Sequence, residues 1–193
     1  GSAEALTIYG NKVGNSFPIY WINSDSVIVA SPECAENRNQ AMYKVDANVP
    51  EGTYPTAAGV LRRVSNIGVQ WGNEATANFY SIYPQRDNNR VTTTDCENFS
   101  INLPTFQTCM IGNNDNPTPY KNIYTNKQVM TTADIYACFM YAKDLGVAKD
   151  KTVNLHYTPF STAIRFRLFT NEVEAGILRV DLIAPEGTNI AGE

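Results

Sequence analysis

The stretch from Thr152 to Thr170, TVNLHYTPFSTAIRFRLFT, decides the fold class that the sequence predicts. Successive side chains of a strand point to opposite faces, so each half of the stretch can bury one apolar row. We therefore expect two strands that meet at a corner containing Pro159, within an antiparallel sheet that has one solvated face. The apolar rows are Val153, Leu155 and Tyr157 in the first half, and Ile164, Phe166 and Leu168 in the second.

Further short segments with strand patterns occur along the chain, separated by Gly, Pro, Asn and Asp. Together they give about seven to nine short strands, a spacing typical of an all-β sandwich. These segments are Ala5–Tyr9, Tyr20–Ile22, Val27–Val29, Ala41–Val45, both ends of Asn66–Gln85, Asn98–Leu103 and Ile177–Ala184.

The segment from Thr132 to Gly146 fits two structures. Its apolar residues fall at helical spacing, with Thr132 as an N-cap and Gly146 as a stop. The run IYACFMYA is also rich in aromatic residues, which favour sheets, and periodicity cannot separate a buried strand from a helix over eight residues. The residues alone therefore leave helix and strand equally open.

Size and composition indicate one globular β-domain over residues 1–193. The chain is 43% apolar and only 18% charged, which suits a sizeable core. Its net charge of −4 and the lack of a basic stripe argue against nucleic acid as a partner. We expect residues 185–193 to be a tail or the start of a second domain.

Catalytic and metal-binding patterns are weak. No phosphate-binding glycine loop or nucleophile elbow is present, and the one histidine, His156, favours a structural or exposed role over catalysis. Asp87 and Asp115 lie in Asn-rich loops that fit solvated turns better than calcium sites. We therefore expect no enzyme activity, no metal and no cofactor.

The cysteines do not match a zinc site, and a core of this size needs no disulfide. Their four positions allow three pairings, and we expect two or more buried free thiols rather than a full disulfide set. They are Cys34, Cys96, Cys109 and Cys138.

Two tryptophans and a pair of arginines have alternative roles. Trp21 and Trp71 could form a flat surface for sugar stacking, but core packing is the stronger expectation. The Arg62-Arg63 pair fits a solvated loop edge better than a proteolytic processing site.

Three segments resemble the fimbrillin-like proteins of Bacteroidales, the subunits of type V pili. They are YWINSDSVIVASP (Tyr20–Pro32), ANFYSIYPQ (Ala77–Gln85), and ADIYACFMYA leading into TVNLHYTPFSTAIRFRL (Ala133–Leu168). The matching elements are Trp21 with Asp25, Tyr83-Pro84, Asp134, and His156 with Ser161.

This resemblance implies a transthyretin-like sandwich of about seven antiparallel strands, with a strand from Asp134 to Tyr141 and a second β-domain after this one. It also implies export as a lipoprotein precursor to the outer membrane, where a lipid anchor on the precursor is the membrane attachment. A trypsin-like protease then removes the first strand, and the exposed edge accepts a strand from another pilin subunit.

The resemblance thus implies a structural pilus subunit at the cell surface, contributing to adhesion. We expect the weak strand Ala5, Leu6, Thr7, Ile8 and Tyr9 to flank the strand-exchange edge. The alternative is an adhesin module that binds a carbohydrate or matrix ligand through Trp21 and Trp71 and does not polymerise.

Overall fold

The computed structural model describes the chain in several blocks, and the statements below refer to these residues. They are 8–9, 19–21, 25–47, 58–85, 91–103, 110–111, 119–121, 128–132, 138–161, 164 and 180–188. Among them strands dominate, and the only helical element is the short 3-10 turn η1 (Glu36–Arg38). The predicted all-β class is confirmed.

The strands are short, and six of the thirteen span two residues, so the structure has more strands than the predicted seven or so. Their bounds are β1 Ile8–Tyr9, β2 Ile19–Tyr20, β3 Ser26–Ala30, β4 Gln40–Asp46, β5 Val60–Arg63, β6 Thr76–Tyr83, β7 Val91–Thr92, β8 Ser100–Ile101, β9 Met110–Ile111, β10 Pro119–Lys121, β11 Gln128–Thr132, β12 Met140–Ala148 and β13 Thr158–Pro159.

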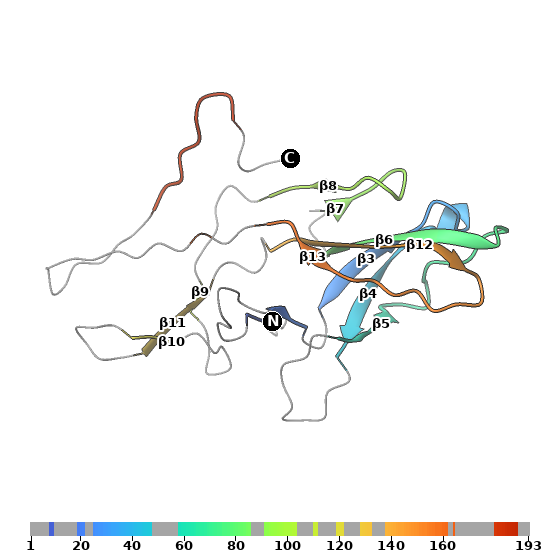
Figure 1. Ribbon diagram of the computed structural model, residues 1–193, viewed down its shortest axis with the longest axis horizontal. Helices are drawn as coiled ribbons and strands as arrows, with labels where there is room; N and C mark the ends of the chain where they lie inside the picture. Colours follow the sequence, from blue (N-terminus) through green and yellow to red (C-terminus); the bar gives the residue numbers. More distant parts are fainter. Residues whose placement is uncertain are drawn as a thin grey trace, which may run out of the picture.

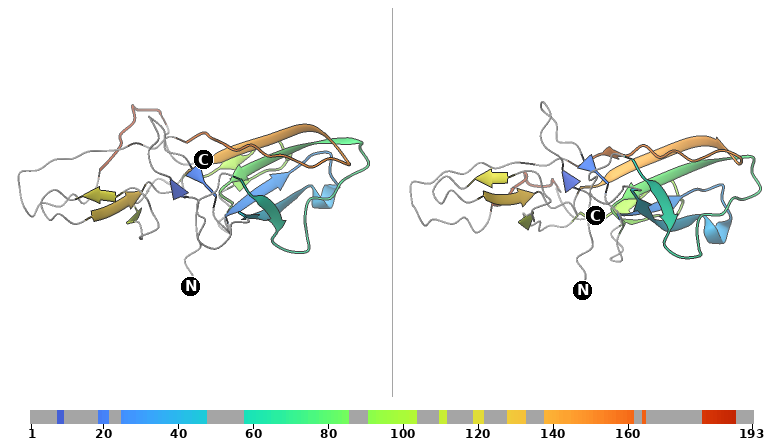
Figure 2. Two further views of the ribbon diagram at one scale, coloured as in Figure 1. Left: turned by 60° about the horizontal axis from the view of Figure 1, so that its bottom comes forward. Right: turned by 90° about the horizontal axis from the view of Figure 1, so that it is seen from below.

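A six-stranded antiparallel sheet in the order β13-β12-β6-β3-β4-β5 forms the centre of the fold. Two further sheets are the two-stranded pairs β1-β2 and β7-β8, and a third is β10-β11-β9. Figure 1 and Figure 2 show β9, β10 and β11 at the opposite end of the molecule from the six-stranded sheet. Pro119 lies on β10, at the edge of its sheet, where a missing N–H costs no ladder bond.

Apolar side chains cover both faces of the six-stranded sheet. On one face, Val27, Val29, Phe79 and Tyr83 form a buried cluster, against which both tryptophans pack. On the other face, a second cluster packs beneath the β7-β8 pair and the residues that follow it. Its members are Ile28, Ile82, Val91 and Phe139, with Phe99, Ile101, Leu103 and Tyr141 packed against them.

This double coverage explains the composition of β3. Its sequence SVIVA is a continuous apolar run rather than an alternating one, and its last four residues are buried. A strand that is buried on both faces has no solvated side for polar residues. The sequence showed such a run at Val27–Val29, and the strand there is confirmed, as is the strand at Ala41–Val45 within β4.

The ambiguous segment contains a strand, β12, and no helix in its described part. Gly146 does not stop a helix but lies in a bulge of β12, where the register against β6 shifts between Asp144 and Val147. Its φ of 66° lies in the left-handed region that glycine adopts without strain. The N–H of Gly146 donates to Oδ1 of Asn78 at 2.8 Å, which fixes the bulge.

The strand expected from Asp134 to Tyr141 is described only from Cys138 onward. β12 begins at Met140 and continues to Ala148, while residues 133–137 lie outside the described part. Cys138 and Phe139 are buried but precede the strand. The strand that the resemblance implied is therefore found only at Met140 and Tyr141 in the described part, because Cys138 and Phe139 are buried without backbone pairing.

The stretch Thr152–Tyr157 is extended but is not assigned as a strand. Its side chains still alternate as predicted: Val153, Leu155 and Tyr157 pack on the core, and their polar neighbours are exposed. Pairing with β12 is limited to β13, so Pro159 lies within an edge strand rather than at a corner. Of the residues after Pro159 in this stretch, the structure describes Phe160, Ser161 and Ile164, and both Phe160 and Ile164 are exposed.

The strand expected over Ile177–Ala184 is not formed in its described part. Residues 180–184 are not in a strand, and Leu182 and Ile183 are 57% and 87% exposed. Alternation determines which side chains share a face, but a strand also needs a neighbouring backbone, and none of the described strands lies along this segment. Figure 1 and Figure 2 show the segment as a loop apart from the six-stranded sheet.

The edge strand β5 was not predicted, because the segment containing Arg62 and Arg63 was interpreted as a loop edge. Charged residues are common on sheet edges, where they do not disturb the core. Nε of Arg62 lies 2.8 Å from Oδ2 of Asp46 on the neighbouring strand β4. The expected solvent exposure of both arginines is confirmed.

Three cysteines, Cys34, Cys96 and Cys138, are buried and unpaired, in agreement with the expected free thiols. Cys109 lies outside the described residues. Cys96 has a positive φ of 64°, in a turn where Oγ1 of Thr93 accepts its N–H at 3.0 Å. Burial raises the pKa of the Cys96 thiol, so it stays protonated at neutral pH.

Candidate functional site: a pocket beside the first sheet

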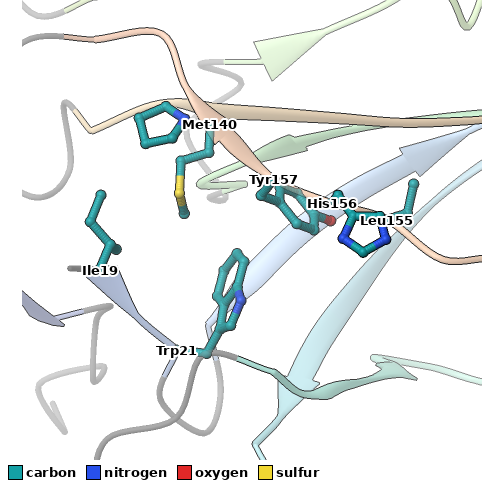
Figure 3. Close-up of a pocket in the computed structure, with 7 residues that line it drawn as sticks. Ile19, Trp21, Met140, Leu155, His156 and Tyr157 are labelled. Carbon is teal, nitrogen blue, oxygen red and sulfur yellow. The ribbon is translucent and has the colours of Figure 1, made fainter.

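A pocket of about 360 Å³ lies where the β1-β2 pair approaches the edge of the six-stranded sheet. Figure 3 shows the side chains of Ile19, Trp21, Met140 and Tyr157 around a common space. Its size is at the lower end of the range of small-ligand sites. Aromatic and aliphatic side chains line it, but more than half of its exposed lining surface is polar. The described lining is Ile19, Trp21, Met140, Leu155, His156, Tyr157 and Pro159.

Tyr157 is anchored by its hydroxyl group. The hydroxyl lies 2.6 Å from Oγ of Ser81, and Oγ of Ser81 donates its own proton to the carbonyl O of Ile28 at 2.7 Å. Tyr157 is therefore the donor to Ser81, because a serine hydroxyl has one proton. Burial raises the pKa of Tyr157 well above its usual value. The ring is held at the pocket wall as a neutral, apolar surface.

Trp21 is held between two tyrosines. Its ring makes edge-to-face contacts with Tyr83 at 5.2 Å and with Tyr157 at 5.0 Å between ring centroids. Such contacts stabilise aromatic pairs by about 0.5–1.5 kcal/mol beyond their burial. Beneath Trp21, the Tyr83 hydroxyl donates to Oδ1 of the buried Asp25 at 3.2 Å. These contacts give the indole a defined orientation at the pocket.

Trp71 belongs to a different part of the same core face. Its ring packs edge-to-face on Phe79 at 5.4 Å, and its backbone forms an isolated bridge with Cys34. Trp71 does not line the pocket. The two tryptophans therefore lie in different places. Both pack on the core, as the sequence predicted, but only Trp21 also lines the pocket.

His156 lies on the exposed side of the pocket, between Leu155 and Tyr157. The seven described lining residues include no carboxylate and no serine, threonine or cysteine. Within the described part of the chain, no three His, Cys, Asp or Glu side chains are grouped as a metal site. The pocket thus combines aromatic and aliphatic walls with a polar share of exposed surface, a mixed lining rather than a purely apolar one.

The predicted strand-exchange edge is described at two of its five residues. Ile8 and Tyr9 form β1, which pairs antiparallel with β2, while Ala5, Leu6 and Thr7 lie outside the described residues. Ile19 of β2 lines the pocket and stands opposite Tyr9 of β1, so the pocket lies beside the strand that pairs with this edge. No sequence pattern indicated that the edge and the pocket would lie close together.

Most pocket residues were not identified as site residues from the sequence. The sequence pattern indicated ordinary core positions for Ile19, Met140 and Leu155. The cavity forms because the fold brings these distant residues together. A signal did exist for Tyr157, because an aromatic residue with a polar tip needs a hydrogen-bond partner when it is buried. The identity of that partner, Ser81, requires the register of β6.

Comparison with protein-family models, with curated proteins and with solved structures gives no match to this chain. Among the residues that the structure describes, no helix has the length and apolar character needed to cross a membrane.

Proposed function

We propose that the chain is a structural subunit of a cell-surface fimbria that assembles by donor-strand exchange after proteolytic removal of a leader strand, and that it contributes to adhesion. The observation that carries the proposal is the segment Val180–Ala184. It has the alternation of a strand, it lies outside the described strands, and its large apolar side chains, Val180, Leu182 and Ile183, are exposed. An exposed strand-forming segment of this kind is suited to completing the sheet of another subunit.

The pocket beside β2 supports the same function. In strand addition, backbone hydrogen bonds provide affinity, and pockets for alternate side chains provide specificity. Ile19 lies on β2, the strand that pairs with β1 of the Ala5–Tyr9 edge, so the pocket lies close to that edge. An apolar side chain of the donated strand would fill this space, and the sequence resemblance to fimbrillin-like proteins points in the same direction.

The test follows assembly of the exported precursor after treatment with a trypsin-like protease, on denaturing gels of unboiled samples and by negative-stain electron microscopy. We expect ladders and fibres for the native chain and their loss in Leu182→Asp. Ile67→Asp is the matched control, since Ile67 is 56% exposed and Leu182 57%, but Ile67 lies in a turn after β5. Equal assembly of both variants, or persistent monomers of the native chain, would overturn the proposal.

A second candidate function is a cell-surface adhesin module that binds a carbohydrate or matrix ligand without polymerising. The Trp21 pocket favours it, because an aromatic wall can stack on an apolar sugar face. A glycan array would then show binding that Trp21→Ala abolishes at a temperature where circular dichroism shows the variant to be still folded. Trp71→Phe, outside the pocket, would retain binding; loss of binding in both variants would exclude the pocket as the specific site.

A further inference from the structure

The outer side of β5 is a free sheet edge. β5 is the last strand of the six-stranded sheet, and none of the described strands pairs with its other side. The N–H of Val64 donates to the carbonyl O of Met42 at 3.5 Å, so the even-numbered residues of this segment bond inward to β4. In an antiparallel ladder the alternate residues, Leu61 and Arg63, turn their N–H and C=O groups outward.

This edge is basic although the chain as a whole carries a net charge of −4. Arg62 and Arg63 are consecutive and therefore point to opposite faces of the sheet. Lys44 stands directly opposite Arg62 on β4, and Asp46 is the one acid of β4 and β5. Asp46 engages Nε of Arg62, a side chain that is 64% exposed and has further N–H donors on its other nitrogen atoms.

Exposed apolar residues flank the arginines. Val60 and Val64 lie two positions from Arg62, on the same face, and are 49% and 41% exposed. On the other face, Gly68 gives the side chain of Arg63 room: a Cβ at this glycine would stand 2.5 Å from the Arg63 Cδ. The edge thus offers outward backbone groups, one cation on each face and apolar contacts beside them.

We propose that the β5 edge binds an extended segment of another protein that carries two adjacent acidic residues among β-branched apolar residues. An antiparallel strand beside β5 would place an acid opposite each of Arg62 and Arg63, one on each face. The residues opposite Val64, Leu61 and Val60 would be apolar. In the direction of the incoming chain, the matching order is apolar, acid, acid, apolar, apolar.

The chemistry of the edge disfavours a second copy of this chain as the partner. The chain has 19 acidic residues, and no two of them are adjacent. Pairing of two β5 edges would bring arginines of both copies together, which is unfavourable for facing strands. The inference is therefore independent of the proposed self-assembly, and either can fail alone.

The test titrates fluorescein-labelled peptides TVEDVVT, TVQNVVT and TVKKVVT into the folded protein and measures fluorescence anisotropy. We expect TVEDVVT to bind about fivefold or more tightly than TVQNVVT, because two partly exposed ion pairs contribute modestly. TVKKVVT should bind more weakly still. Affinity for TVEDVVT should fall as salt rises from about 0.05 to 0.5 M, because surface charges are then screened.

Two controls separate strand addition from attraction by charge. TVEDVVT that is N-methylated at the residues opposite Arg63 and Leu61 keeps its charges but loses the N–H groups that would bond to β5, and we expect its binding to be lost. The Arg62→Glu, Arg63→Glu variant, checked for an unchanged Tm, should prefer TVKKVVT instead. The proposal is overturned if the three peptides bind alike, if N-methylation has no effect, or if the charge-reversed variant retains the original preference.

Discussion

Two segments of this chain carry the same alternating pattern and have different fates. Val153, Leu155 and Tyr157 pack against the core, although their backbone is not assigned to a strand. Val180 and Leu182 alternate in the same way, yet they are 45% and 57% exposed. The pattern therefore determines which side chains share a face, whereas burial depends on what lies next to that face.

The first segment is held by contacts that involve side chains rather than a ladder. The N–H of Asn154 donates to Oδ2 of Asp144 at 2.6 Å, and the Tyr157 hydroxyl bonds to Ser81 at 2.6 Å. The indole of Trp21 adds an aromatic contact. The second segment shows no comparable packing on either core cluster. Replacing these contacts one at a time will show how much each one contributes to holding the first segment on the core.

Of these changes, Tyr157→Ala should lower the free energy of unfolding most. It removes the aromatic contact with Trp21 and the hydrogen bond to Ser81, and it leaves a cavity beside the sheet. We expect the free energy of unfolding to fall by about 3 kcal/mol, the lower end for aromatic truncations because the ring is partly exposed. Urea unfolding measures it, and a loss of less than about 1 kcal/mol would show that this segment is no better anchored than Val180–Ala184.

Ser81→Ala should destabilise by about 2 kcal/mol. Ser81 is fully buried, and its loss leaves the Tyr157 hydroxyl without its acceptor and the carbonyl of Ile28 without its donor. The double variant with Tyr157→Phe should recover part of the loss, since the unpaired phenol is then absent. Strict additivity in this double-mutant cycle would contradict the hydrogen bond.

Alkaline pH should weaken the first segment selectively. Burial raises the pKa of Tyr157 above its ordinary 10.0, so the folded state keeps the phenol neutral while the unfolded chain ionises near pH 10. The free energy of unfolding is therefore not reduced by this group below about pH 10, and it falls as the pH rises above that value, because only the unfolded chain ionises the phenol. Urea midpoints from pH 8 to about 11.5 should decline less steeply for Tyr157→Phe than for the native chain, and parallel curves would count against the shift.

Asp144→Asn should cost about 1 kcal/mol. It replaces the charged acceptor of the Asn154 N–H by a neutral amide, which weakens a charge-assisted bond at the surface. Hydrogen exchange at the Asn154 amide should accelerate, while exchange in β3 stays unchanged. Unaltered exchange at Asn154 would mean that packing of Val153 and Leu155 alone holds the backbone there.

Leu182→Ala should have the smallest effect, within about 0.5 kcal/mol, because the side chain is already 57% exposed. The matched comparison is Leu155→Ala, at an apolar position of the packed segment, which we expect to cost more than 1 kcal/mol. Urea unfolding of the isolated protein checks both variants. Equal effects would remove the distinction between the two segments.

The sequence by itself determined the all-β class, the strands at Val27–Val29 and Ala41–Val45, and the alternation of exposed and packed side chains in Thr152–Tyr157. These features depend on local pattern and on the two-residue period of extended backbone, both of which are present in the sequence. The expectation of free buried thiols was met at Cys34, Cys96 and Cys138 for a related reason: a large apolar core shelters small apolar groups and needs no disulfide.

The tertiary structure alone decided which patterned segments found a neighbour. It placed β5 at the sheet edge, left Val180–Ala184 exposed, and brought Ile19, Trp21, Met140 and Tyr157 around one pocket. Sequence could not supply these results, because pairing and cavities depend on contacts between residues far apart in the chain. Ser81 and Tyr157 lie 76 positions apart, and only the register of the sheet and the path of the chain beside it bring their hydroxyl groups together.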